Sequence, residues 1–113
     1  MIKRVFTIFI LNLLLLLSSP VFSLDTSSKT LEKYTKKISN KFTSTYCNTS
    51  KFGISYEGAL AFAIGETNKE FKNNEFNKLI DYSLLKNSIV NNLENICQVY
   101  DFEISNLENL KFN

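Results

Sequence analysis

Apolar side chains recur at steps of three and four along much of this chain, which is the spacing of one face of an α-helix. The first stripe predicts a helix over residues 29–46 and consists of Leu31, Tyr34, Ile38, Phe42 and Tyr46. The "CNTSKFG" stretch that follows predicts a loop, with Gly53 suited to a positive backbone angle. Ser55 is placed to cap a second helix over residues 56–71.

The segment from residue 74 to residue 100 is helical in pattern, but its apolar positions do not share one face. Phe76, Leu79 and Ile80 lie on one side of a helical wheel, whereas Leu85, Ile89 and Ile96 lie nearly opposite. We therefore expect a break between residues 81 and 84, capped by Asp81 or Ser83. This predicts a short helix near 74–81 and a longer one over 84–100.

The chain ends in "SNLENLKF", where Ser105 and Glu108 have the spacing of a capping box and predict a final short helix. The alternation of Phe102 and Ile104 leaves a short strand as the second interpretation. The fold class is thus all-α, a small bundle of four to five helices within a single domain over residues 24–113.

Residues 1–23 have the features of a signal peptide. Lys3 and Arg4 precede an apolar run over residues 5–17, and "SSPVFS" then predicts cleavage before Leu24. An uncleaved signal anchor that makes a membrane protein of the chain is the alternative. The run of thirteen positions is, however, shorter than the roughly 20 residues that a membrane-spanning helix needs.

The balance of positive and negative residues bears on which partners this chain could bind. Without Lys3 and Arg4 the chain has eleven lysines and eleven acidic residues. This balance gives nucleic-acid binding no support, because such binding depends on excess positive charge. One possible face for an acidic partner, or for anionic lipid headgroups, lies opposite the first apolar stripe and consists of Lys29, Lys33, Lys36 and Lys37. A plain solvated helix face is the simpler interpretation.

The two cysteines, Cys47 and Cys97, suggest a disulfide in an exported protein, since oxidising compartments favour disulfides. Catalysis is poorly supported: the chain has no histidine, the usual general base at neutral pH, and no catalytic or cofactor motif. Nor does any His or Cys cluster suggest a metal site. We therefore expect no catalytic residue, cofactor or metal. The alternative is an enzyme that uses Glu57 or Glu66, which would require one of these carboxylates to be buried beside a cleft.

All three glycines and all three alanines fall within residues 53–65. On the predicted second helix Gly58, Ala61 and Gly65 share one side, which would let another helix backbone approach closely. Because a glycine within a helix costs about 1 kcal/mol relative to alanine, some interaction should offset two of them. Close packing within the domain is one explanation, and a groove for a partner or ligand is the other.

The segments "FTSTYC", "GISYEGALAFAIGE" and "NNLENIC" together resemble a pattern found in small exported cyanobacterial proteins of unknown function. The composition, which suggests an AT-rich genome, is similar to that of marine picocyanobacteria. The resemblance covers residues 31–100 and implies the periplasm or thylakoid lumen, both compatible with a Cys47–Cys97 bridge. That family carries no known activity, so the resemblance bears on location and fold.

These features predict a non-catalytic binding protein, an accessory or assembly factor for a membrane-associated complex. It would dock through the lysine face or the small-residue helix to a protein partner that the sequence does not identify. The alternative is a carrier whose helices enclose a small apolar ligand.

Overall fold

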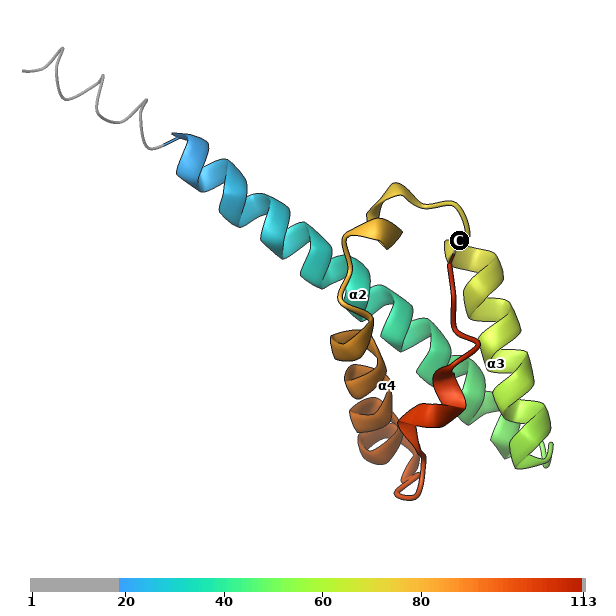
Figure 1. Ribbon diagram of the computed structural model, residues 1–113. Coiled ribbons are helices and arrows are strands. Elements are labelled where there is room, and N and C mark those ends of the chain that lie inside the picture. The colour runs from blue at the N-terminus through green and yellow to red at the C-terminus, as the bar shows by residue number, and fades with distance from the viewer. Residues whose placement is uncertain (1–18, 113) are drawn as a thin grey trace, which may run out of the picture. The chain divides into compact units, whose positions relative to one another are not determined.

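The computed structural model describes residues 19–112, and it describes side-chain surroundings from residue 28 onward. Three α-helices occur in this part of the chain: α2 (Ser19–Lys51), α3 (Tyr56–Phe71) and α4 (Tyr82–Cys97) (Figure 1). Two short 3₁₀ helices, η1 (Glu75–Lys78) and η2 (Ile104–Leu107), complete the elements. The all-α prediction is confirmed, since residues 19–112 contain no strand.

The chain divides into two compact units, residues 1–30 and residues 31–113. Most of the predicted signal peptide, residues 1–18, lies outside the described residues. Of the first unit, the structure describes a helical backbone over residues 19–30, with Ser28, Lys29 and Thr30 exposed. Within the described part of the chain, no helix is both long enough and apolar enough to cross a membrane.

The first predicted helix was too short, because α2 continues through "CNTSK" to Lys51. Side-chain hydroxyls bond to the helix backbone here: Thr49 donates to the carbonyl of Thr45, as Thr43 does to that of Ser39. The predicted glycine turn follows, with Gly53 at a φ of +79°. Since left-handed backbone is costly for residues with a Cβ, glycine suits this position.

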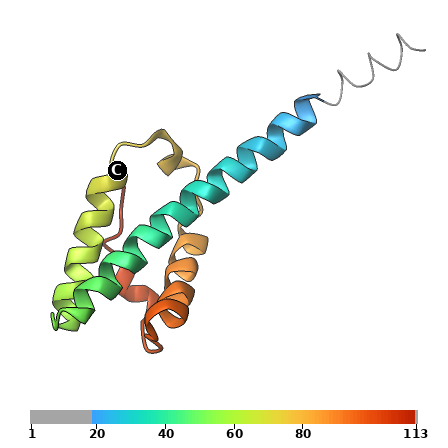
Figure 2. The ribbon, with the colours of Figure 1, turned by 180° about the vertical axis from the view of Figure 1, so that it is seen from behind.

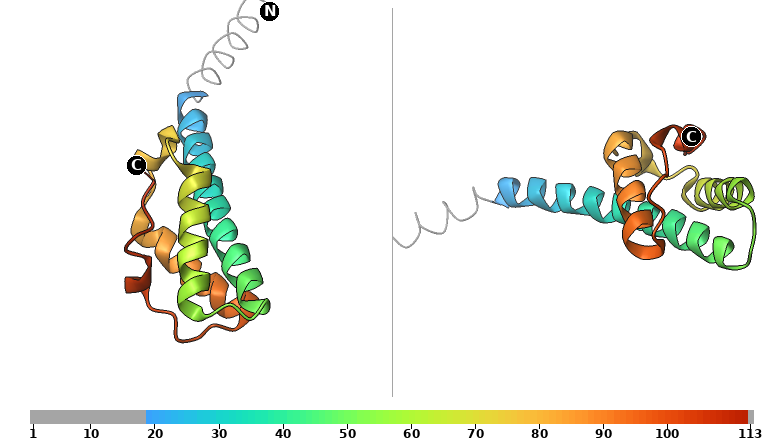
Figure 3. Two further views of the ribbon diagram at one scale, coloured as in Figure 1. Left: turned by 90° about the vertical axis from the view of Figure 1, so that its right-hand side faces the viewer. Right: turned by 90° about the horizontal axis from the view of Figure 1, so that it is seen from below.

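The apolar stripe of α2 is buried as predicted from Tyr34 to Tyr46, with Leu31 partly buried, and α3 and α4 pack with it around a common core (Figures 2 and 3). The main contributions from α4 are Leu85, Ile89 and Leu93. The segment after α4 adds to the same core and buries Phe102, Leu107, Leu110 and Phe112. These last residues run alongside α3, where the side chain of Asn68 bonds to the backbone of Asn109 and Lys111.

The predicted break near residue 81 is confirmed. Asp81 caps α4 by accepting hydrogen bonds from the backbone amides of Ser83 and Leu84. The two short helices predicted near residue 74 and after residue 105 are 3₁₀ turns of four residues each. Single turns of this kind are the usual form of short connectors. The described residues therefore hold three α-helices where we expected four or five.

Candidate functional site

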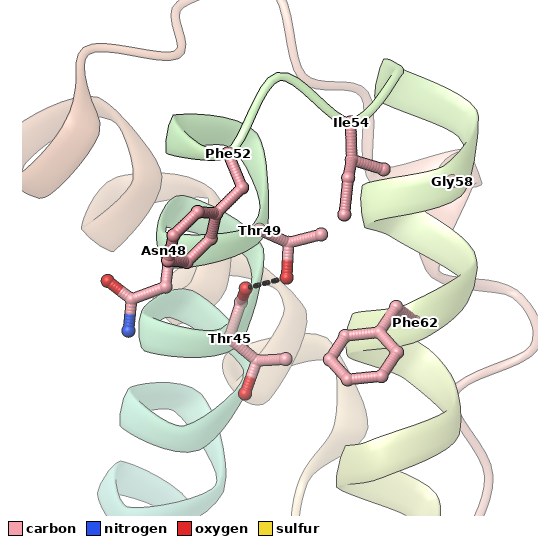
Figure 4. A pocket seen from close by; sticks show the side chains of 7 residues that line it. All are labelled: Thr45, Asn48, Thr49, Phe52, Ile54, Gly58 and Phe62. Carbon is pink, nitrogen blue, oxygen red and sulfur yellow. Dashed lines mark hydrogen bonds between the residues drawn. The ribbon is translucent and has the colours of Figure 1, made fainter.

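An apolar groove lies between the C-terminal end of α2 and the N-terminal end of α3, with a volume of about 590 Å³. Its lining comes from both helices and the turn between them: Thr45, Asn48, Thr49, Phe52, Ile54, Gly58 and Phe62. Phe52 and Phe62 stand on opposite sides, and Thr49 lies between them (Figure 4). The groove is thus walled by two aromatic side chains.

The α2 wall is less polar than its sequence suggests. The hydroxyl of Thr49 donates a 2.6 Å hydrogen bond to the backbone carbonyl of Thr45, one turn earlier in the helix (Figure 4). Because that donor is already satisfied within α2, an apolar occupant would bury the Thr49 hydroxyl without breaking its hydrogen bond. An apolar group can therefore cover Thr49 without the usual cost of burying an unpaired donor.

Three large apolar side chains at the groove are exposed to solvent. The exposed fractions are 82% for Phe52, 49% for Ile54 and 53% for Phe62. Single exposed apolar side chains are ordinary on protein surfaces, but a gathered group commonly marks a binding site. Sequence reasoning missed Phe52 and Phe62. No local signal could have found them, since neither position is unusual in the sequence until α2 and α3 are placed side by side.

The small-residue side of α3 faces solvent. Ala61 and Gly65 are exposed, and a Cβ built on Gly65 would meet no atom within 4 Å. The interpretation that Gly58, Ala61 and Gly65 pack together against another helix is therefore wrong for the last two. α3 instead turns a neighbouring row inward, which consists of Ala59, Ala63, Thr67 and Phe71.

Gly58 is half-buried and lines the groove. A Cβ at this position would lie 2.9 Å from Cγ2 of Ile54 and 3.2 Å from the hydroxyl of Ser55. Ser55 caps α3 by accepting a hydrogen bond from the Gly58 amide. The absence of a side chain at Gly58 thus lets Ile54 lie over the first turn of α3. Among Gly58, Ala61 and Gly65, Gly58 is the residue that lines the groove.

The predicted lysine face is solvated. Lys33, Lys36 and Lys37 are exposed on α2, and Lys29 is exposed in the first unit. The carboxylates considered for catalysis are scattered: Glu57 is exposed and Glu66 is half-buried, and neither lines the groove. Among the described residues, no group of three His, Cys, Asp or Glu side chains could hold a metal ion.

Cys47 and Cys97 stand at disulfide distance, as predicted, with Cα atoms 5.9 Å apart. Bonded cysteines normally show a Cα separation of this size. Cys47 is buried, and it directly precedes Asn48 of the groove. The bond therefore joins the last turns of α2 and α4 beside the groove.

A cluster of aromatic rings lies near this end of the fold. The ring of Tyr46 meets those of Tyr56 and Phe102 edge to face. Burial raises the pKa of Tyr46, and nearby Tyr56 and Asp101 raise it further. Partial burial also raises the pKa of Tyr56, and the nearby charge of Asp101 raises this pKa further. The side-chain amide of Asn106 donates a hydrogen bond to the Tyr56 hydroxyl.

No protein-family model, curated protein or solved structure matches this chain. Similarity to a protein of known activity therefore contributes nothing to the choice of function. The groove and the export features of the sequence are the observations from which a function can be argued.

Proposed function

We propose that this chain is an exported binding protein, an accessory or assembly factor that docks onto a membrane-associated complex through the α2–α3 groove. One observation carries the proposal: three exposed apolar side chains surround a groove of about 590 Å³. Sites for small molecules and anchoring groups span about 300–1,000 Å³ and are mostly apolar.

The energetics favour an occupant that covers the aromatic walls. Full burial of an exposed Phe or Ile side chain contributes about 1.5–3 kcal/mol. Phe52 has the most to gain, since 82% of it is exposed. Buried aromatic side chains also supply much of the binding energy at protein interfaces. A partner that covers Phe52, Ile54 and Phe62 would thus gain affinity from a small area.

Export is supported by residues 1–23, by the paired cysteines and by the resemblance to exported cyanobacterial proteins. We place the protein in the periplasm or thylakoid lumen, with an uncleaved membrane anchor as the alternative. Mass spectrometry of the native protein distinguishes them. A mature form that begins at Leu24 supports cleavage, whereas an intact Met1 with no shorter form supports the anchor.

A second candidate function is the carriage of a small apolar ligand, which the same groove volume favours. Native mass spectrometry of protein isolated from its own cells tests this. A bound lipid or pigment of defined mass, lost from a Phe62→Ser variant, would favour the carrier. The absence of any bound small molecule would favour the protein partner.

Photo-crosslinking in cells tests the leading proposal. A photoreactive p-benzoyl-phenylalanine replaces Phe62 in one strain and Leu84 in a control strain. Leu84 is also apolar and exposed, but it lies on α4 and does not line the groove. We expect a discrete crosslinked protein from the membrane fraction for position 62 only. Equal crosslinking at both positions, or none at position 62, would contradict docking through the groove.

A further inference from the structure

A row of five residues at steps of four runs along α2: Lys33, Lys37, Lys41, Thr45 and Thr49. Residues four apart are neighbours on successive turns, but each step rotates about 40° round the helix axis, so the row winds round α2. Its last two members line the groove. Its first three members are lysines, which are exposed or half-exposed. Lys41 and Lys37 therefore continue the row beyond the groove, whereas Lys33 is rotated about 160° from Thr49 and lies on another side of α2.

The charge differs between the two walls. α2 has no acidic residue from Lys33 to Lys51. On α3, by contrast, Glu66 follows Phe62 at the next helical turn, and Lys69 and Glu70 follow in turn. The α3 wall thus continues into mixed charge, whereas the α2 wall continues into positive charge alone. An occupant that extends out of the groove along this stretch of α2 would meet lysines as its only charged side chains.

We infer that the groove binds a partner protein's segment in which one or two large apolar side chains are followed by acidic residues. The apolar side chains enter between Phe52 and Phe62, and the acidic residues lie along Lys41 and Lys37. Complementary charge of this kind sets the orientation of a partner and speeds its association. This inference rests on the proposed function, because it names the kind of partner that the same groove accepts.

The hollow form of the site favours a protein segment over a membrane surface. Phe52 and Phe62 lie on opposite sides of the groove, with Thr49 between them (Figure 4). A segment with protruding side chains can fill such a hollow, whereas a flat bilayer would contact mainly its rim. Anionic lipid is therefore the competing occupant that the experiment must distinguish.

The test begins with a random twelve-residue peptide library displayed on phage. It is selected against the oxidised protein, purified after export from a bacterial host. Peptides that also bind a Phe62→Ser variant are removed in a counter-selection. We expect enriched peptides to combine Trp, Phe or Leu with neighbouring Asp or Glu. Failure to enrich any peptide in repeated selections would overturn the inference.

Titration of the best peptide then tests its orientation. The double variant Lys37→Glu, Lys41→Glu should weaken binding at least tenfold, and raised salt should weaken binding to the unmodified protein. The matched control is Lys72→Glu, Lys78→Glu, which makes the same change in charge at exposed positions off α2. It should alter affinity less than twofold. Replacing the acidic residues of the peptide by Gln or Asn should abolish the difference between the two double variants.

The outcomes separate the inference from the proposal beneath it. Peptides that need Phe62 but show no acidic preference would overturn the inference and leave groove docking intact. Binding to phosphatidylglycerol vesicles that is lost in Phe52→Ser, without any selected peptide, would replace the protein segment by a lipid surface. If peptides are enriched only when the counter-selection is omitted, and their affinity is unchanged in Phe52→Ser and Phe62→Ser, both are overturned. Circular dichroism of each variant controls for folding.

Discussion

The phenol of Tyr34 donates a 2.6 Å hydrogen bond to Oδ1 of Asn77, which lies 43 positions later in the chain. The amide nitrogen of Asn77 in turn donates to the carbonyls of Phe71, at 2.8 Å, and Phe112, at 2.9 Å. One buried side chain therefore links α2, the end of α3 and the C-terminal segment. Since both carbonyls can only accept, the orientation of the amide is fixed.

Replacement of Asn77 by Ala should lower the free energy of unfolding by about 3 kcal/mol, because each buried group left without a partner costs about 1–3 kcal/mol. Tyr34→Phe removes only one hydrogen bond and should cost about 1 kcal/mol. Urea denaturation followed by circular dichroism measures both. A smaller loss for Asn77→Ala than for Tyr34→Phe would show that Asn77 does not hold these segments together.

Removal of the disulfide should destabilise the fold. A bridge between positions 50 residues apart stabilises by about 4 kcal/mol on the chain-entropy model. The double variant Cys47→Ala, Cys97→Ala should therefore unfold at markedly lower urea concentration than the oxidised protein. Reduction of the unmodified protein should have a similar effect. Equal unfolding midpoints with and without reductant would show that the bridge contributes little.

Substitution by alanine should change the stability of the fold in opposite directions at two of the glycines. Gly65 lies within α3 with open space around it, so Gly65→Ala should stabilise by about 0.5–1 kcal/mol. Gly53 has a φ of +79°, so Gly53→Ala should destabilise by about 1–2 kcal/mol. Thermal unfolding of the pair measures the contrast. A destabilising Gly65→Ala would revive the interpretation that this glycine is tightly packed.

Stability should fall at alkaline pH. Burial raises the pKa of Tyr34, with a further contribution from Tyr82, and the pKa of Tyr46 is raised as well. The unfolded chain therefore loses these protons at lower pH than the folded protein does. The stabilisation of the fold by protonated Tyr34 and Tyr46 is therefore fully present below about pH 10 and is lost as the pH rises above it.

Thermal unfolding between pH 8 and pH 11 tests this, with absorbance at 295 nm to follow phenol ionisation. Tyr46→Phe should reduce the alkaline loss. Tyr100→Phe is the control, since the Tyr100 side chain is 72% exposed. If Tyr46→Phe left the alkaline slope unchanged while Tyr100→Phe reduced it, burial of Tyr46 would not be the cause.

Local capping and periodicity predicted much of the fold. Ser55 and Asp81 cap α3 and α4 as expected, and the stripe from Tyr34 to Tyr46 is buried. These features depend on near neighbours in sequence, so a pattern can reveal them. The extension of α2 through Lys51 could not be predicted in this way. It runs through Asn, Thr and Ser, which have low helix propensity, and tertiary contacts hold it.

The groove could not be predicted because it needs the relative placement of two helices. Phe52 is in a turn, and Phe62 lies on α3 outside its buried row. Neither position is unusual until the turn at Gly53 brings α2 and α3 together. The small-residue pattern at Gly58 and Gly65 marked the correct helix. The side of α3 that packs against the core was predicted wrongly, since Ala59 and Ala63 pack inward and Gly65 does not.

The bond between Cys47 and Cys97 also has a mechanical consequence. Cys47 directly precedes Asn48, so the α2 wall of the groove is anchored covalently to the last residue of α4. A pulling force on an occupant of the groove would pass into α4 through this bond. The bond would limit how far the end of α2 moves relative to α4 under such a pull.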